Sequence, residues 1–244
     1  MLRTLLLALC GAGLAAAVHA QEPIRFARTP DISPDGQQIA FSYLGDIWTV
    51  EAIGGVVRPV TMHEAHDLHP VFSPDGRWIA FSSSRHGSYD VFVVSARGGK
   101  PQRLTFDSAA DLVCGWTPDG SQVLFASTRG TGFPPGMTLY SVPARGGAER
   151  VLPFPTAKDI AIAPKGDAVA YVAGPGLWYR KGYRGSSNDD IWLAAPDGTN
   201  HRRLTDFNGQ DASPMWSPDG KRLYYVSEHF GTSNIVFRDL SNPG

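Results

Sequence analysis

This sequence has few cysteines and almost no net charge. It holds two cysteines in 244 residues, and only Cys114 lies beyond the first twenty. One cysteine excludes an internal disulfide, and its apolar neighbours predict a buried, inert thiol. The formal net charge is -1 at pH 7, whereas a nucleic-acid-binding or membrane-binding surface is usually basic. We therefore expect neither nucleic acid nor a membrane as a partner of the mature chain.

Catalytic motifs and helical patterns are also missing. The chain contains neither a Gly-x-Ser-x-Gly nucleophile elbow nor a phosphate-binding P-loop. His63, His66 and His69, with Glu64 and Asp67, suggest a metal cluster, but their spacing does not fit the His-Glu-x-x-His helix motif. We interpret these histidines as loop residues and predict no metal, no cofactor and no catalytic residue. No stretch beyond the first twenty residues shows helical periodicity.

The first twenty residues have the pattern of a secretory signal peptide. Arg3 is followed by an apolar stretch from Leu5 to Leu14, and Val18-His19-Ala20 forms a small-x-small cleavage site. The apolar stretch is too short to span a bilayer. We predict that residues 1–20 are removed and that the mature protein is exported to the periplasm. A cytoplasmic location is the alternative if the signal is not used.

A tetrapeptide repeat dominates the rest of the chain. Copies of Ser-Pro-Asp-Gly, or close variants, begin at Ser33, Ser73, Thr117, Ala163 and Ser217, with spacings of 40, 44, 46 and 54 residues. A repeat of this period, with short apolar runs between turn signals, is typical of β-propeller blades. The 27 glycines and 19 prolines suit a chain with many turns. The predicted fold class is therefore all-β, a propeller of four-stranded blades.

Blade two shows the expected order of strands most clearly. A first strand at 68–72 leads through the tetrapeptide turn to strands at 78–82, 89–95 and 102–105, with a Gly-Gly hairpin at Gly98-Gly99. The propeller is expected to occupy residues 21–244. The predicted blades span about 24–61, 62–105, 106–153, 154–205 and 206–244.

The fifth predicted blade is incomplete. Its third strand, from Asn234 to Asp239, is followed by Ser241-Asn242-Pro243-Gly244 without a Gly turn or a fourth strand. Ring closure is how a propeller removes its open strand edges, and unpaired edges invite aggregation. We expect these five blades to form part of a six-bladed propeller in a longer protein.

Four aspartates form the first candidate site. Asp67, Asp111 and Asp211 each stand six residues before their turn motif, and Asp159 stands four before its own. An even offset keeps all four on one strand face, and first strands usually line the central channel of a propeller. The carboxylates could therefore ring one mouth of the channel. In the alternative that we favour, each Asp binds the backbone of its own inter-blade loop.

An insertion in blade four forms the second candidate site. The chain from Gly174 to Asp189 separates the second and third strands of this blade and accounts for the 54-residue spacing. Long structured loops are often functional, but a surface loop packed by its own aromatics explains it equally well. The residues that could bind a polyanion or a peptide C-terminus are Trp178, Arg180, Lys181, Tyr183 and Arg184.

Three stretches carry a resemblance to a known family. They are Gly45-Asp46-Ile47-Trp48, the run from Asp111 to Gly120, and Lys181-Gly182-Tyr183-Arg184-Gly185 leading to Asp190-Ile191-Trp192. The blade repeat resembles that of TolB-type propellers. The order of the three stretches is more similar to the N-terminal propeller of tricorn-type serine proteases, and the resemblance covers residues 24–240.

The resemblance implies a function for the longer protein. Tricorn-type proteases carry a six-bladed and a seven-bladed propeller before a catalytic region, and their subunits form hexamers. The propellers are thought to guide oligopeptides in and products out, while a C-terminal serine nucleophile performs hydrolysis. The resemblance assigns no catalytic residue to this chain. Alternatives are a non-catalytic periplasmic TolB-like binding module, or the propeller of a prolyl-oligopeptidase-like or amidohydrolase-like enzyme.

Overall fold

The protein is an all-β propeller of five blades. The computed structural model describes residues 23–130, 136–174 and 182–241 and places nineteen strands in them. No helix in this part of the chain is long and apolar enough to cross a membrane. The predicted signal peptide lies outside the described residues. The predicted all-β fold class and the predicted incomplete fifth blade are both confirmed, because the strands form four four-stranded sheets and one three-stranded sheet.

Each sheet is an antiparallel meander whose strands follow chain order. Blade 1 contains β1 (Arg28–Ile32), β2 (Gln38–Tyr43), β3 (Asp46–Glu51) and β4 (Arg58–Pro59). Blade 2 contains β5 (Asp67–Phe72), β6 (Trp78–His86), β7 (Ser88–Ser95) and β8 (Gln102–Arg103). Blade 3 contains β9 (Asp111–Trp116), β10 (Gln122–Ser127), β11 (Thr138–Pro143) and β12 (Arg150–Val151). Blade 4 contains β13 (Asp159–Ile162), β14 (Val169–Ala173), β15 (Asp190–Ala194) and β16 (Arg202–Arg203), and blade 5 contains β17 (Asp211–Trp216), β18 (Arg222–Ser227) and β19 (Asn234–Asp239).

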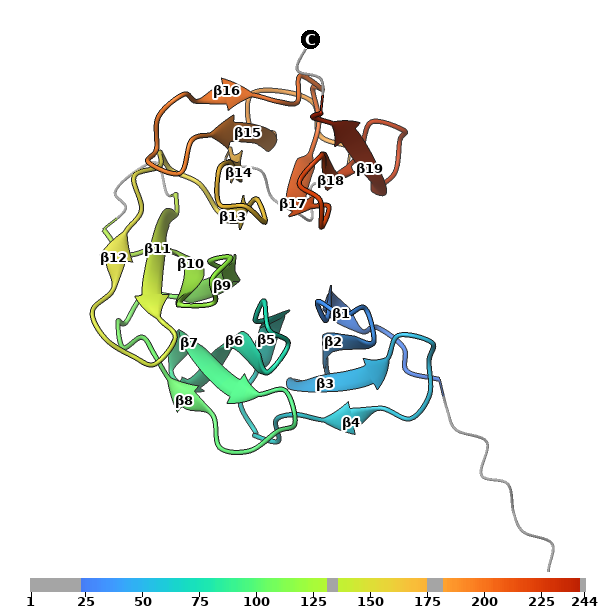
Figure 1. Cartoon of the computed structure of the whole chain (residues 1–244), viewed down its shortest axis with the longest axis vertical. Helices are drawn as coiled ribbons and strands as arrows, with labels where there is room; N and C mark the ends of the chain where they lie inside the picture. The colour runs from blue at the N-terminus through green and yellow to red at the C-terminus, as the bar shows by residue number, and fades with distance from the viewer. Residues whose placement is uncertain (1–22, 131–135, 175–181, 242–244) are drawn as a thin grey trace, which may run out of the picture.

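The blades follow one another around a central space. Their first strands, β1, β5, β9, β13 and β17, lie on the inner side, and the fourth strands lie on the outer side (Figure 1). The ring is open between blade 5 and blade 1 (Figure 1). Because each sheet runs outward from the centre, its two faces meet the neighbouring blades, which explains the continuous apolar runs in the sequence.

The apolar core lies between blades rather than within one. Ile47 and Val60 of blade 1 pack with Ile79, Phe81 and Phe92 of blade 2, and all five are at most 6% exposed. Equivalent clusters join blades 2 and 3, blades 3 and 4, and blades 4 and 5. Removing one large side chain such as Phe81 would cost about 3 to 5 kcal/mol, because its neighbours could not close the resulting cavity. Each blade is therefore stabilised mainly by its neighbours.

Hydrogen bonds between inner strands fix the stacking of the blades. The indole N–H of Trp116, the last residue of β9, donates to the carbonyl of Val71 on β5 at 3.0 Å. Trp216 makes the same bond from β17 to Ala161 on β13, also at 3.0 Å. In blade 2 the corresponding residue is Phe72, and its backbone N–H donates to a carboxylate oxygen of Asp31 on β1 at 2.7 Å.

The tetrapeptide turns are closed by their own side chains. In blade 2, Ser73 Oγ donates to Asp75 Oδ1 at 2.6 Å and accepts from the backbone N–H of Trp78 at 3.0 Å. The backbone N–H of Arg77 also donates to Asp75 Oδ1, at 3.0 Å. Gly76 has a φ of 69°, and an added Cβ there would lie 3.6 Å from Pro34 in the preceding turn. A residue with a side chain would therefore be strained at this position.

Apolar side chains lie exposed on the two blades that flank the opening. In blade 5, Ile235 and Phe237 of β19 are 70% and 55% exposed. In blade 1, Phe26 and Val56 are 85% and 65% exposed. In the four closed junctions, by contrast, apolar residues of neighbouring blades form the buried clusters.

Candidate functional site

Three of the predicted aspartates occupy one register position in three blades. Asp67, Asp111 and Asp211 begin β5, β9 and β17 and are at most 2% exposed. Each lies opposite a serine of the second strand, the pairs being Asp67–Ser83, Asp111–Ser127 and Asp211–Ser227. Side chains at this position therefore point into the blade and not toward solvent.

Arginines at the ends of the second strands neutralise two of these carboxylates. Arg85 Nη2 donates to both oxygens of Asp67 at 3.0 and 2.8 Å, and Arg85 Nε donates to Ser83 Oγ at 2.7 Å. Its guanidinium carbon lies 5.6 and 4.8 Å from the ring centroids of Phe81 and Phe92. The charged pair is therefore held against the aromatic core of blade 2.

The same arrangement recurs in blade 3. Arg129 binds Asp111 and Glu149, and its guanidinium carbon lies 5.5 and 5.0 Å from the ring centroids of Phe125 and Tyr140. In both blades the arginine follows the aspartate by eighteen residues. The sequence analysis missed these arginines, although this constant spacing could have revealed them.

Blade 5 differs because the residue eighteen positions after Asp211 is His229. Burial raises the pKa of Asp211, and the hydroxyls of Ser227 and Thr205 offset this only in part. The His229 ring packs edge-on against Phe207, with ring centroids 4.8 Å apart. Blade 5 therefore has a histidine at the sequence position where blades 2 and 3 have an arginine.

Asp159 is a different case from the other three. It begins β13 but matches the register of His69 and Ser213, while Ala157 occupies the position of the buried aspartates. Asp159 is partly exposed, and its Oδ1 accepts from the Ile160 backbone N–H at 2.9 Å. Burial raises its pKa to about 7, against smaller opposing effects of that hydrogen bond and of the Lys158 charge.

The placement of the four aspartates bears on the channel-mouth prediction. Asp67, Asp111 and Asp211 share a face as expected, but burial separates their carboxylates from any ligand in the central space. The partners recorded for Asp67 and Asp111 are side chains of their own blade, and not the backbone of the inter-blade loops. Asp159 is the one of these four residues that is partly exposed. A role of these aspartates in the channel stays a prediction.

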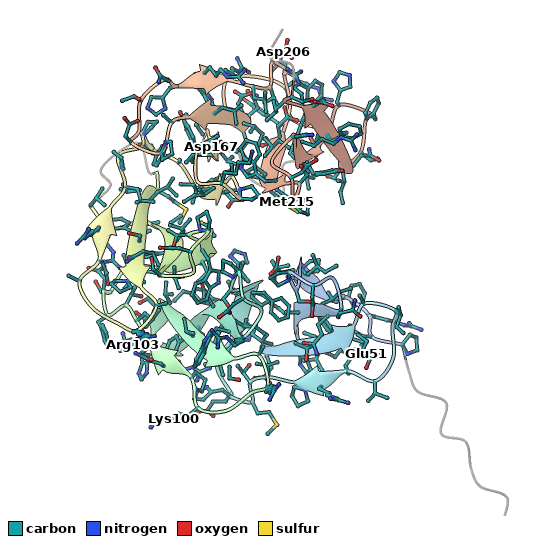
Figure 2. The ribbon with its side chains drawn as sticks, viewed as in Figure 1. Glu51, Lys100, Arg103, Asp167, Asp206 and Met215 are labelled. Atoms are coloured by element: carbon teal, nitrogen blue, oxygen red, sulfur yellow. The ribbon has the colours of Figure 1, made fainter. Side chains whose placement is uncertain are left out.

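Asp31 is an inner-strand carboxylate that the sequence analysis did not select. It stands two residues before the first turn motif, where the other blades carry Val71, Gly115, Ala161 and Met215. Burial raises its pKa to about 6, although the N–H groups of Phe72 and Ile32 stabilise the charged form. Met215 is 46% exposed and lies on the side of blade 5 toward the central space (Figure 2).

The described part of the insertion packs against the junction of blades 4 and 5. Arg184 lies 4.5 Å over the Phe207 ring and 4.0 Å from a carboxylate oxygen of Glu228. The Gly182 N–H donates to that same Glu228 oxygen at 3.1 Å, and the Gly185 N–H donates to Asn208 Oδ1 at 2.8 Å. These contacts support a structural role for Arg184, and ligand binding there stays a prediction.

Other predicted residues lie apart from one another or outside the described residues. Trp178, Arg180 and Lys181 fall outside, while Tyr183 lies beside Arg184 in the described part. No group of three or more His, Cys, Asp or Glu residues suited to a metal occurs in 23–130, 136–174 and 182–241. Burial also raises the pKa of Cys114 well above its usual range, so its thiol stays protonated.

Known proteins similar to this chain include tricorn protease homologs and TolB proteins. The family described as the tricorn protease N-terminal beta propeller domain matches residues 24–242. Tricorn protease homolog 1 of Streptomyces coelicolor is 32% identical over 203 residues, which are 83% of this chain and 19% of that protein. A TolB homolog of Chlorobium luteolum is 43% identical over 53 residues, 22% of this chain and 12% of that protein.

Solved structures with a similar fold include a tricorn protease and a TolB protein. The crystal structure of the tricorn protease aligns with a TM-score of 0.76 at 24% identity, covering 89% of this chain and 22% of that one. TolB from Acinetobacter baumannii aligns with a TM-score of 0.66 at 20% identity, covering 88% of this chain and 52% of that one. These likenesses show the fold alone. The chain spans about a fifth of the length of the tricorn proteins that it matches.

Proposed function

Because this chain belongs to the family of tricorn protease N-terminal β-propeller domains, we propose that it is the propeller part of an exported tricorn-like serine peptidase. The observation that carries the proposal is the family match over residues 24–242, together with 32% identity to a tricorn protease homolog across 83% of the chain. A catalytic region elsewhere in the longer protein would perform hydrolysis. A hexameric assembly of the longer protein belongs to the same proposal.

In this proposal the propeller guides oligopeptides or products through its central space. The inner strands present few charged groups there, because Asp67, Asp111 and Asp211 are buried in their own blades. The exposed Met215 and the partly exposed Asp159 and Asp31 lie on inner strands, on three different blades. Such a mixed surface suits the passage of peptides of varied sequence, because strong binding would slow their release.

The first test is the mass of the native polypeptide, measured by immunoblot of a periplasmic fraction with an antibody against this segment. A band several times larger than 26.3 kDa would support a multidomain peptidase. A band near 24 kDa would overturn the proposal. It would favour a stand-alone TolB-like binding propeller, which the TolB alignments make the second candidate.

A second test addresses passage through the propeller. In the full-length protein, Met215→Trp should narrow the central space and slow hydrolysis of long oligopeptides, but not of short chromogenic substrates. Val151→Trp is the matched control, because residue 151 is also exposed but lies on the outer fourth strand of blade 3. Equal rates for all three proteins on long substrates would count against guidance through the channel.

A further inference from the structure

The face of the propeller that carries the tetrapeptide turns has two adjoining clefts. One lies between blades 1 and 2 with a volume of 970 Å³, and the other lies between blades 2 and 3 with a volume of 740 Å³. Both are lined by Pro74, Asp75, Arg77 and Trp78, so the blade-two turn and the start of β6 separate them. The two clefts and this ridge are called the turn-face groove below.

Trp78 distinguishes blade two from the other blades. The residues at its register position are Gln38, Gln122, Ala168 and Arg222. Trp78 is 46% exposed, although a large aromatic side chain is usually buried. The indole N–H groups of Trp48, Trp116 and Trp216 each donate to a backbone carbonyl, whereas that of Trp78 has no acceptor recorded among the described residues. An exposed indole with a free donor is typical of a binding surface.

In the described part of the turn-face groove, the acidic side chains have hydrogen-bond partners, whereas several arginine side chains do not. The carboxylates of Asp35, Asp75 and Asp119 accept hydrogen bonds from their own turns. Those hydrogen bonds lower the pKa of each of these aspartates, so the carboxylates stay ionised and engaged. The exposed guanidinium groups of Arg58 and Arg97 in the first cleft and Arg145 in the second have no side-chain partner among the described residues.

We propose that the turn-face groove binds an extended polypeptide segment with acidic side chains. A proline or other apolar side chain of the segment would stack on Trp78. Carboxylates on either side would reach Arg58 and Arg97 in one cleft and Arg145 in the other. Guanidinium groups bind carboxylates well because their donors match the two oxygens, and the proline-lined walls leave few backbone donors to compete. This inference does not depend on the proposed peptidase function.

The test measures binding of a capped, fluorescein-labelled Glu-Pro-Glu-Pro-Glu peptide to the full-length protein that contains this propeller, by fluorescence anisotropy. Trp78→Ala should weaken binding about tenfold or more, as expected for an interface hot spot. Arg97→Ala and Arg58→Ala should each weaken it about threefold to tenfold. Arg202→Ala is the matched control, because Arg202 is also exposed and begins the fourth strand of blade 4, as Arg58 does in blade 1. Its affinity should equal that of the wild type.

Two further probes distinguish an acidic peptide from other occupants. The Gln-Pro-Gln-Pro-Gln peptide should bind at least about tenfold more weakly, because it lacks the charges that pair with arginine. Equal affinity for both peptides, or an unchanged affinity of the Trp78→Ala variant, would overturn the proposal. Inorganic polyphosphate that outcompetes the peptide and binds Trp78→Ala as tightly as the wild type would also overturn it, by revealing a general anion surface. None of these readouts requires peptidase activity, so they stay separate from the test of the proposed function.

Discussion

At the scale of single residues, a buried aspartate–arginine pair marks blades 2 and 3. Asp67 and Asp111 are fully or almost fully buried, and each is paired with an arginine that lies against two aromatic rings. Blades 1 and 4 have alanine at the aspartate position, Ala27 and Ala157. A buried carboxylate without its counter-ion is costly. In blade 5, where no arginine follows Asp211 at the same spacing, burial raises the pKa of this carboxyl instead.

We predict that Arg129→Met destabilises the protein by about 3 to 5 kcal/mol, because Asp111 would keep a buried charge without its counter-ion. The free energy of unfolding, measured in urea, checks this. The Arg129→Met and Asp111→Asn changes together should recover part of the loss. Arg77→Met is the control, since the exposed Arg77–Asp75 pair should contribute less than about 1 kcal/mol. Equal losses at Arg129 and Arg77 would contradict the interpretation.

Asp159 gives a prediction with a defined pH window. Burial raises its folded-state pKa from 3.8 to about 7, so the native protein binds a proton more tightly than the unfolded chain does. The contribution of Asp159 to the free energy of unfolding is therefore fully present below about pH 4 and is lost as the pH rises to about 7.

Asp159→Asn should accordingly raise the free energy of unfolding at pH 8 and have no effect near pH 4. One pKa unit corresponds to about 1.4 kcal/mol, and partial exposure of the side chain reduces the total. We expect a gain of about 1 to 2 kcal/mol at pH 8. Thermal unfolding followed across this pH range measures it. A gain that is the same at both pH values would exclude titration of Asp159 as the cause.

At the scale of elements, the tetrapeptide turn is the unit that the sequence repeats. Ser33, Thr117 and Ser217 donate to their turn aspartates at 2.5, 2.6 and 2.6 Å, as Ser73 does at 2.6 Å. Blade 4 departs from this pattern, because it has Ala163 and Lys165 at the two positions. Its turn keeps the positive φ of Gly166, at 73°, but cannot form the side-chain bonds.

The double change Ala163→Ser with Lys165→Asp should therefore stabilise blade 4 by about 1 kcal/mol. Thermal unfolding should show a higher midpoint, whereas Ser73→Ala in blade 2 should lower it. Turn hydrogen bonds lower the pKa of Asp75 to about 2, so the stability from such an aspartate is lost as the pH falls from about 4 to about 2. The gain from the new Asp should vanish over the same window. A gain that persists at pH 2 would argue against the turn hydrogen bond as its source.

Inner-strand bulges are an element that the sequence did not indicate. Thr29, His69 and Ser213 have φ values of 45°, 53° and 53° at the same register position of β1, β5 and β17. The strand pairing shifts at these points in all three blades. A bulge lets one extra residue bend the strand locally. The sequence pattern does not reveal the bulge, because the apolar residues on either side of it still point to the faces that the pattern predicts.

At the scale of the whole molecule, the five described blades leave the ring open. Ile235 and Phe237 are exposed on the face of β19 opposite Val236, which packs against the blade 4–5 core. In blade 1, the exposed Val56 lines a pocket with Ile39 and Phe41 of β2. A further blade that completed the ring would cover these apolar side chains. An unpaired β19 edge beside apolar side chains is a template for association with a second chain.

We predict that the segment 21–244 expressed alone is poorly soluble or oligomeric, and that the propeller with a sixth blade is monodisperse. Size-exclusion chromatography with light scattering measures this. Lysine at positions 235 and 237, made as Ile235→Lys and Phe237→Lys, should shift the segment toward monomer. If the unmodified segment runs as a clean monomer with a sharp thermal transition, the inference from the open ring is wrong.

Sequence by itself determined the blade repeat, the all-β class, the family and the incomplete fifth sheet. These depend on local signals, namely the turn chemistry of residues such as Ser73 and Gly76 and the apolar runs between turns, which act over short stretches of chain. Only the tertiary structure decided which charged and aromatic side chains are buried and which residues they contact. Whether Asp67 faces a channel or Arg85, and whether Trp78 is buried or exposed, depends on how strands far apart in sequence pack, because burial and pairing are properties of the assembled blades.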